Sequence, residues 1–198
     1  MIVTNHLNDM IKNRKIVFLT GFLTFFTLSI VFAQKPIPVD PMSKGSWLLN
    51  FGFGPGVPVF GNGSGFGPAG KIAFETGMWE LGPGVLTLGG EAGFSFFAHK
   101  FGEDWRETWI NMMFGARSAY HYGWQIRGLD TYGGIPLGIG FCANSYDDQP
   151  GHDNAFPVYP YLGFFFGASW FFTNNIGINA EIGYNSTYAN IGLVFRIQ

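Results

Sequence analysis

Two segments near the end of the chain, IGINAEIGY (residues 176–184) and ANIGLVFRI (residues 189–197), alternate between apolar residues and polar or small ones. The apolar positions share one parity in each segment: Ile176, Ile178, Ala180, Ile182 and Tyr184, then Ala189, Ile191, Leu193, Phe195 and Ile197. Val194 is the one large apolar residue on the other parity. Because successive side chains of a β-strand point to opposite faces, each segment is predicted to be a strand with one apolar and one polar face.

The same alternation recurs upstream and predicts about eight strands in all, at residues 46–54, 68–78, 85–97, 110–121, 134–141, 157–171, 176–184 and 189–198. Predicted long loops at residues 55–67, 98–107 and 142–156 alternate with short turns at residues 82–84, 123–128 and 173–175. We expect the long loops to share one end of the molecule and to face outside. Pro136 and Pro160 each lack an amide donor, so a bulge or a frayed end is expected at each.

The composition favours a protein that is covered by lipid. Charged residues make up 12% of the chain, compared with about 25% in ordinary soluble domains, and aromatic residues make up 19%. A membrane-spanning β-barrel accounts for both, since lipid contacts its outside and aromatic rings lie at the two interfaces. A net charge of −2 without a basic stripe argues against a nucleic-acid partner, and a single cysteine, Cys142, excludes an internal disulfide.

The first part of the chain has the features of an export signal. Three basic residues, Lys12, Arg14 and Lys15, precede an uncharged apolar stretch at residues 16–32, and Ala33 follows it. We therefore predict a secretory signal peptide at residues 1–33, cut after Ala33, with translation starting at Met1 or Met10. An uncleaved anchor is the alternative. A periplasmic N-terminal segment at residues 34–45 and a barrel domain at residues 46–198 complete the predicted organisation.

Three stretches carry a resemblance to a known family: FFGASWFFTNNIG (residues 165–177), AEIGY (180–184) and NIGL (190–193). With them, residues 46–198 resemble the small outer-membrane β-barrel domain family of OmpA/OmpX-like proteins. The resemblance implies an all-β, eight-stranded antiparallel up-and-down transmembrane β-barrel in the outer membrane of a Gram-negative bacterium. It also implies a monomer whose partners are outer-membrane lipid, the barrel assembly machinery during insertion, and an extracellular or envelope protein bound through the loops. It indicates no specific activity, because such barrels are grouped by architecture.

Five charged residues fall on the small and polar face of the predicted strands: Glu75, Glu91, Arg117, Glu181 and Arg196. In a narrow barrel that face is the interior, where an unpaired charge is very costly. We therefore expect the acids to pair with the arginines in a packed lumen, and Glu181 to pair with Arg117 or Arg196. Many inward glycines suit such a tight cross-section.

The sequence predicts no catalytic residues, no metal site and no cofactor. The Gly-x-Gly-x-x-Gly spacing at residues 65–70 leads into a strand pattern, whereas a dinucleotide loop must lead into a helix. The acidic stretch at residues 147–153 lacks a complete calcium-loop pattern. After the signal the histidines are His99, His121 and His152, interpreted as loop residues, and no Gly-x-Ser-x-Gly motif occurs. We expect a non-enzymatic barrel with a structural or surface-interaction role. A small-solute channel, a lipid-modifying barrel enzyme and a soluble periplasmic β-barrel binder remain as alternatives.

Overall fold

The computed structural model describes residues 42–56, 67–101, 105–146 and 157–197, all within the compact unit Ile37–Gln198. The predicted signal peptide and residues 34–41 lie outside the described residues. The strands are β1 (Trp47–Pro55), β2 (Pro68–Leu81), β3 (Gly84–Phe101), β4 (Trp105–Tyr122), β5 (Leu129–Tyr146), β6 (Val158–Leu162), β7 (Phe164–Phe171), β8 (Ile176–Tyr184) and β9 (Ala189–Ile197). No helix in the described ranges has the length and hydrophobicity needed to cross a bilayer.

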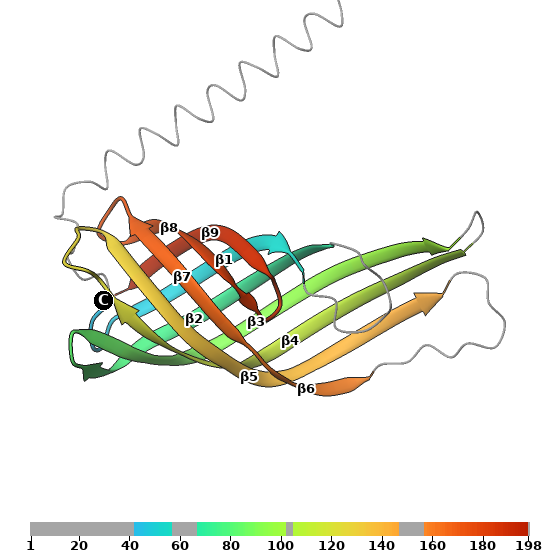
Figure 1. Cartoon of the computed structure of the whole chain (residues 1–198), viewed down its shortest axis with the longest axis horizontal. Coiled ribbons are helices and arrows are strands. Elements are labelled where there is room, and N and C mark those ends of the chain that lie inside the picture. The colour runs from blue at the N-terminus through green and yellow to red at the C-terminus, as the bar shows by residue number, and fades with distance from the viewer. Residues whose placement is uncertain (1–41, 57–66, 102–104, 147–156, 198) are drawn as a thin grey trace, which may run out of the picture. The chain divides into compact units, whose positions relative to one another are not determined.

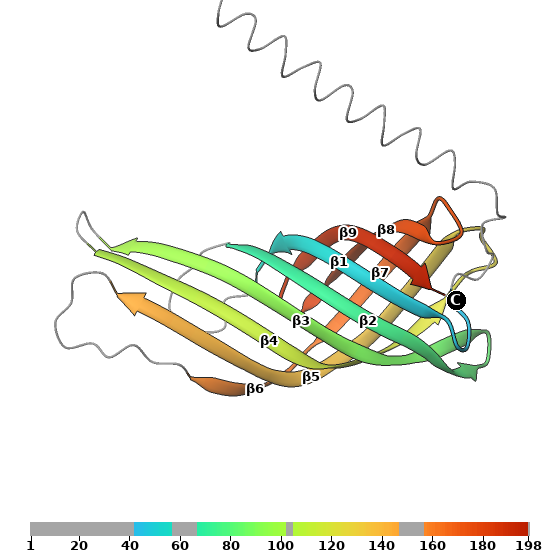
Figure 2. The same cartoon turned by 180° about the vertical axis from the view of Figure 1, so that it is seen from behind.

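The strands form one closed antiparallel sheet. From β1 to β5 each strand pairs with the next in the sequence, β5 also pairs with β7, and β7 and β8 pair with β8 and β9; the ring closes where β1 pairs with β9. β6 and β7 both pair with β5 and follow one another along it, so they are two parts of one strand (Figures 1 and 2). The result is an eight-stranded up-and-down β-barrel, which confirms the predicted fold class.

The interruption between β6 and β7 lies opposite a proline. Gly163 separates the two parts, and its amide donates to the carbonyl oxygen of Pro136 at 3.0 Å. Pro136 has no amide hydrogen with which to answer, so one ladder bond is missing here. The pairing resumes in the same register on both sides, between Gly134 and Phe165 and between Leu137 and Leu162. The irregularity expected at Pro136 is therefore a break without a register shift.

Short turns lie at one end of the barrel, which we call the turn end. It holds residues 82–83, 123–128 and 172–175, together with the start of β1 and the end of β9 (Figure 1). In the turn between β4 and β5 the amide of Ile126 donates to Gly123 at 3.1 Å, and φ is +54° at both Trp124 and Gln125. Positive φ at both central residues is the pattern of a type I′ turn, which usually carries Asn and Gly there.

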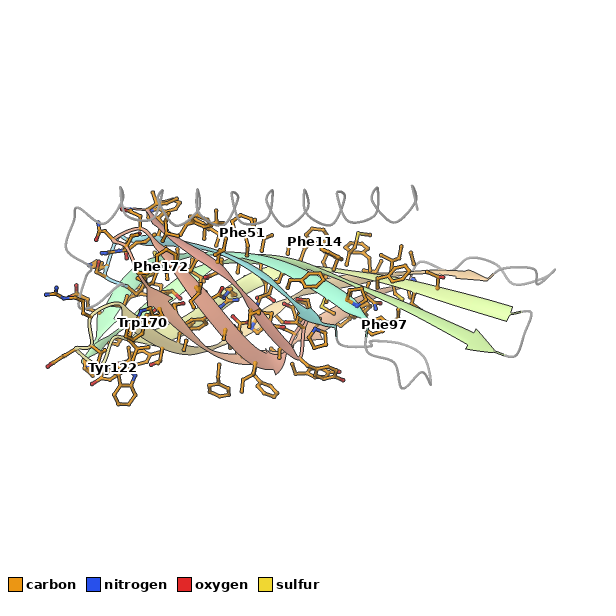
Figure 3. All side chains as sticks on the ribbon, turned by 90° about the horizontal axis from the view of Figure 1, so that it is seen from above. Phe51, Phe97, Phe114, Tyr122, Trp170 and Phe172 are labelled. Atoms are coloured by element: carbon orange, nitrogen blue, oxygen red, sulfur yellow. The ribbon has the colours of Figure 1, made fainter. Side chains whose placement is uncertain are left out.

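Side chains alternate between the interior and the exterior as the sequence pattern predicts. Polar residues point inward, and every strand exposes large apolar residues outward, among them Phe51, Ile72, Phe94, Phe114, Leu137, Leu162, Phe166, Ile182 and Ile191. In Figure 3, Phe51 and Phe114 lie midway along the barrel, Tyr122 and Trp170 lie nearer the turn end, and Phe97 lies toward the opposite end. The protein thus has a polar inside and an apolar outside.

An apolar layer fills the interior near the turn end. Met42, Leu48, Val85, Phe171 and Val194 form one buried cluster. Met42 belongs to the segment before β1, which is fixed by hydrogen bonds from Gly45 to Gly77 and from Gly77 to Ser46. Val194, the exception to the alternation of β9, is completely buried because it belongs to this layer.

Two predicted loop boundaries are wrong because the strands on that side of the barrel are long. β3, β4 and β5 each span 18 residues, and β3 and β4 continue beyond the shorter strands (Figures 1 and 2). The stretch predicted as a loop at residues 98–107 is therefore mostly strand. Cys142 is also not a loop residue, since it pairs with Asn111 inside β5 and its side chain is 0% exposed.

Candidate functional site

The interior of the barrel contains a network of charged side chains from six strands. Its members are Lys71 and Glu75 on β2, Glu91 on β3, Arg117 and His121 on β4, Asp130 and Tyr132 on β5, Tyr161 on β6 and Glu181 on β8. All of them are buried. The inward parity of each strand brings these residues to the lumen, and the closure of the sheet brings distant parts of the sequence into contact.

Arg117 is the centre of this network. Its Nε lies 2.6 Å from Glu75 Oε1, its Nη1 lies 3.1 Å from Glu91 Oε2 and its Nη2 lies 3.1 Å from Glu181 Oε2. The Nη contacts are hydrogen bonds, whereas the Nε contact is a close ion pair without hydrogen-bond alignment. The guanidinium also lies over the ring of Phe165, with Cζ 3.8 Å from its centroid. One planar cation therefore joins carboxylates from three strands.

Glu181 receives several partners in addition to Arg117. Lys71 Nζ contacts Glu181 Oε1 in a second buried ion pair. The amide of Asn185 donates to the same oxygen at 3.2 Å, and the hydroxyl of Tyr132 lies 3.4 Å from Oε2. Both carboxylate oxygens are thus occupied, which offsets much of the cost of burying the charge.

His121 continues the network toward the turn end. Its Nε2 lies 3.0 Å from Glu75 Oε2 and its Nδ1 lies 2.8 Å from Asp130 Oδ2, while its ring stacks on Tyr132 with the centroids 4.9 Å apart. An ionised carboxylate can only accept hydrogen bonds. The arrangement is therefore fully satisfied when both ring nitrogens carry a hydrogen and the imidazolium lies between two carboxylates.

Hydroxyl groups complete the coordination of the remaining carboxylate oxygens. Tyr161 donates to Glu91 Oε1, and Thr87 donates to Glu75 Oε2. Thr87 also accepts a hydrogen bond from the amide of Ala119 at 3.2 Å. The hydroxyls tie the ionic network to the backbone ladder, so its side chains have little freedom to rearrange.

The five residues singled out in the sequence do not all meet. The structure places Glu75, Glu91, Arg117 and Glu181 in direct contact. Arg196 is also buried, but it forms no ion pair with any described residue, and its Nε has no hydrogen-bond partner among them. Of the two arginines considered for Glu181, Arg117 is the one in contact.

Sequence reasoning missed Lys71, His121, Asp130, Tyr132 and Tyr161. Lys71 could have been found, because it has the same parity as Glu75 on the same strand. His121, interpreted as a loop residue, is in fact buried between Glu75 and Asp130. Asp130 lies outside the predicted fifth strand, whose expected start is residue 134. The observed strand β5 begins earlier, at Leu129. Tyr132 and Tyr161 are uncharged, so a search for charged residues on the inward face does not identify them.

The described residues contain no group of three or more His, Cys, Asp and Glu side chains arranged to hold a metal ion. The acidic stretch at residues 147–153 and His152 lie outside the described residues, as does the side chain of His99. Residues 68–81, which follow the glycine-rich stretch, form β2. That stretch consequently leads into a strand and not into a phosphate-binding helix.

A small polar pocket lies at the turn end of the network. Its volume is about 230 Å³, and Ser43, Glu80 and Pro83 line it together with His121 and Asp130. Met42 and Val85 of the apolar layer line the same pocket. The described lumen therefore holds the ionic network in its middle and an apolar layer near the turn end.

Comparison with known proteins gives likenesses of structure only. No protein-family model matches the chain, and no curated protein matches its sequence. Among solved structures, the attachment invasion locus protein Ail of Yersinia pestis in complex with the heparin analogue sucrose octasulfate is similar at 12% identity and a TM-score of 0.49, covering 78% of this chain and 100% of that one. The N-terminal β-barrel domain of Pseudomonas aeruginosa OprF is similar at 13% identity and a TM-score of 0.44, covering 78% and 98%. The eight-stranded architecture of this chain follows from its own strand pairing.

Proposed function

We propose that the protein is an integral β-barrel of a Gram-negative outer membrane, with a closed interior and a structural or surface-interaction role. The observation that carries the proposal is the inverted distribution of side chains. Large apolar residues are exposed on every strand, whereas Lys71, Glu75, Arg117 and Glu181 are buried inside. A soluble monomer would not expose such an outer surface, because contiguous exposed apolar patches are small on soluble proteins.

The lengths of the strands support insertion into a bilayer. β1, β8 and β9 each have nine residues, and a tilted transmembrane strand needs about 9–11. Exposed aromatic residues near the turn end, including Trp79, Trp124 and Trp170, suit the boundary between hydrocarbon and water. The closed ring leaves no unpaired edge within this zone.

The orientation follows from the ends of the barrel. β1 begins and β9 ends at the turn end, so a chain exported through the predicted signal at residues 1–33 would keep that end in the periplasm. The long hairpin of β3 and β4 would then extend outside the cell. Its position supports a role in contacting an extracellular or envelope partner.

The packed network argues for a closed barrel over a channel. An eight-stranded barrel has room only for side chains, and Arg117 occupies that room together with three carboxylates. We also propose that the protein is not an enzyme, because the carboxylates and His121 of the described network are engaged with one another, with Arg117 and with Lys71, rather than oriented toward a nucleophile. Lipid and the barrel assembly machinery are the partners that this role requires.

Fractionation of cells that produce the full chain tests the proposal. We expect the protein in the outer-membrane fraction, resistant to extraction with alkaline carbonate, and faster on a gel before boiling than after it. The unboiled form reports a folded barrel, while resistance to extraction reports insertion. Recovery in the soluble periplasmic fraction, with no shift on boiling, would favour the soluble binder instead.

A further inference from the structure

An apolar groove lies on the outer surface near the turn end. Its volume is about 470 Å³, and outward side chains of four adjacent strands line it: Leu129 on β5, Ala168 and Trp170 on β7, Ile178 and Ala180 on β8, and Ile191 and Leu193 on β9. The groove is on the surface that the proposed function places in lipid, so the inference drawn from it rests on that function.

The groove exists because two small residues lie side by side between larger ones. Ala168 and Ala180 are direct cross-strand partners, and Ile191 continues their row. The next row toward the turn end consists of Leu129, Trp170, Ile178 and Leu193, which also pair in succession. The row on the other side contains Phe166 and Ile182, again partners. The methyl groups of Ala168 and Ala180 form the bottom of the groove, and the larger side chains of the two flanking rows form its walls. A groove of this shape can accept a flexible hydrocarbon chain.

An exposed cation lies close in the sequence to a residue that lines this groove. Arg127 is exposed and precedes the groove residue Leu129 by two positions, in the turn between β4 and β5. That turn is attached to the end of β7, because the amide of Phe171 donates to the carbonyl oxygen of Gly128 at 2.7 Å. Among the side chains that the structure describes, Lys44 and Arg127 are the exposed cations. Arg127 is therefore the described exposed cation that is nearest in the sequence to a residue of the groove.

A second outer groove, of about 570 Å³, lacks this combination. It is lined by Phe51, Ile72, Phe94, Met112 and their neighbours. Its only cationic lining residue, Lys71, points into the lumen and is paired with Glu181. Such a surface can accept hydrocarbon, but it offers no charge for a headgroup.

We infer that the first groove is a binding site for one anionic phospholipid of the periplasmic leaflet. An acyl chain lies over Ala168 and Ala180, the indole of Trp170 lies at the interface, and the headgroup phosphate pairs with Arg127. Hydrophobic contact supplies most of the affinity, while the guanidinium selects a phosphate over an uncharged headgroup.

Native mass spectrometry of the folded full-length barrel in detergent, titrated with dioleoyl phosphatidylglycerol, tests the inference. The unmodified protein should retain one lipid more strongly than any later one. The double change Ala168→Leu/Ala180→Leu fills the groove and should abolish that first binding step. Arg127→Gln should weaken it by about two- to fivefold, as expected for an exposed ion pair.

Two variants serve as matched controls. Ala116→Leu enlarges an exposed alanine on β4, across the barrel from β9, and Lys44→Gln removes the other exposed cation. Both should bind the first lipid as the unmodified protein does. Uniform, weak binding without a distinct first step, or an unchanged first step in the groove-filling variant, would overturn the inference. Insertion into lipid vesicles is measured on the same samples: a barrel that inserts but shows no such site refutes the lipid site alone, whereas failure to insert refutes the proposed function.

Discussion

Arg117 determines the interior at the scale of single residues. Its guanidinium contacts Glu75, Glu91 and Glu181, which come from three strands. An ammonium group carries the same charge and three donors, but they share one nitrogen, whereas the guanidinium spreads its donors over three nitrogens of a planar fork. A lysine at this position would therefore not reproduce the contacts of Arg117.

The first prediction concerns Arg117→Lys and Arg117→Met. Arg117→Met should lower the free energy of unfolding by about 3–5 kcal/mol, the usual cost of leaving buried charges without their partner. Arg117→Lys should be only slightly more stable than Arg117→Met. Unfolding by urea in lipid vesicles, followed by tryptophan fluorescence, gives the free energy. If Arg117→Lys were as stable as the unmodified protein, the forked geometry would be irrelevant.

The second prediction concerns the pair of Lys71 and Glu181. Glu181→Gln leaves Lys71 buried without its carboxylate, and Lys71→Met leaves Glu181 with Arg117 as its remaining cation. The double variant removes both charges, so it should be more stable than the sum of the two single losses predicts. The same urea titrations give the coupling free energy. Additive losses would show that the two side chains do not interact energetically.

At the scale of elements, the strands and their faces could be predicted from the sequence. The period of two is strong in β2, β4, β8 and β9 because one face of each strand is exposed and apolar and the other faces the polar lumen. The ends of β3, β4 and β5 could not be predicted. Beyond the part of the barrel with an apolar outer face, both faces of a strand can be polar, so its sequence looks like that of a loop. Cys142 illustrates this: it follows Phe141 at a point where the alternation weakens, yet the ladder continues to Tyr146.

The partners within the network could not be predicted either. Glu75, Glu91 and Glu181 all have inward parity, but parity says nothing about height along the barrel axis. That height depends on the register of every strand pair and on the stagger needed for closure. Arg117 and Arg196 were therefore equivalent candidates in the sequence, and the structure separates them, with Arg117 in the network and Arg196 apart from it.

The third prediction uses Cys142 as a probe of β5. Its buried side chain should resist a bulky maleimide on intact cells and on cells with a permeabilised outer membrane. Labelling should become complete after unfolding by boiling in detergent. Rapid labelling of the folded protein would mean that β5 ends before Cys142.

The fourth prediction concerns the turn between β4 and β5. Gln125 has a positive φ, which costs a residue with a side chain about 1–2 kcal/mol. Gln125→Gly should therefore stabilise the barrel by about 1 kcal/mol. Gly128→Ala, at a φ of +80°, should have the opposite sign and serves as the control. The urea midpoint in vesicles measures both, and a loss of stability in Gln125→Gly would contradict the assigned turn.

At the scale of the whole molecule, the distribution of polar and apolar side chains is the reverse of that in a soluble protein. The interior holds the ionic network around Arg117 together with the separate Arg196, and the exterior holds side chains such as Ile191, 73% of which is exposed. In the proposed membrane setting, insertion into lipid would remove this apolar area from water.

The fifth prediction concerns conductance. In planar bilayers the unmodified barrel should show no steady channel, because Arg117 and its carboxylates fill the cross-section. Removing charge by Glu181→Gln should produce at most brief, small openings. A stable channel at low protein concentration would put solute transport in place of a structural role.

Folding into lipid tests the central claim most directly. The unfolded chain, diluted from urea into preformed phosphatidylcholine vesicles, should become compact and heat-modifiable on unboiled gels, whereas dilution into buffer alone should leave it unfolded or aggregated. Leu193→Arg, which places a charge on the exposed face of β9, should lower stability by about 2–4 kcal/mol if that position lies near the bilayer midplane. A chain that folded equally well without lipid, and that tolerated Leu193→Arg, would contradict a membrane-spanning barrel.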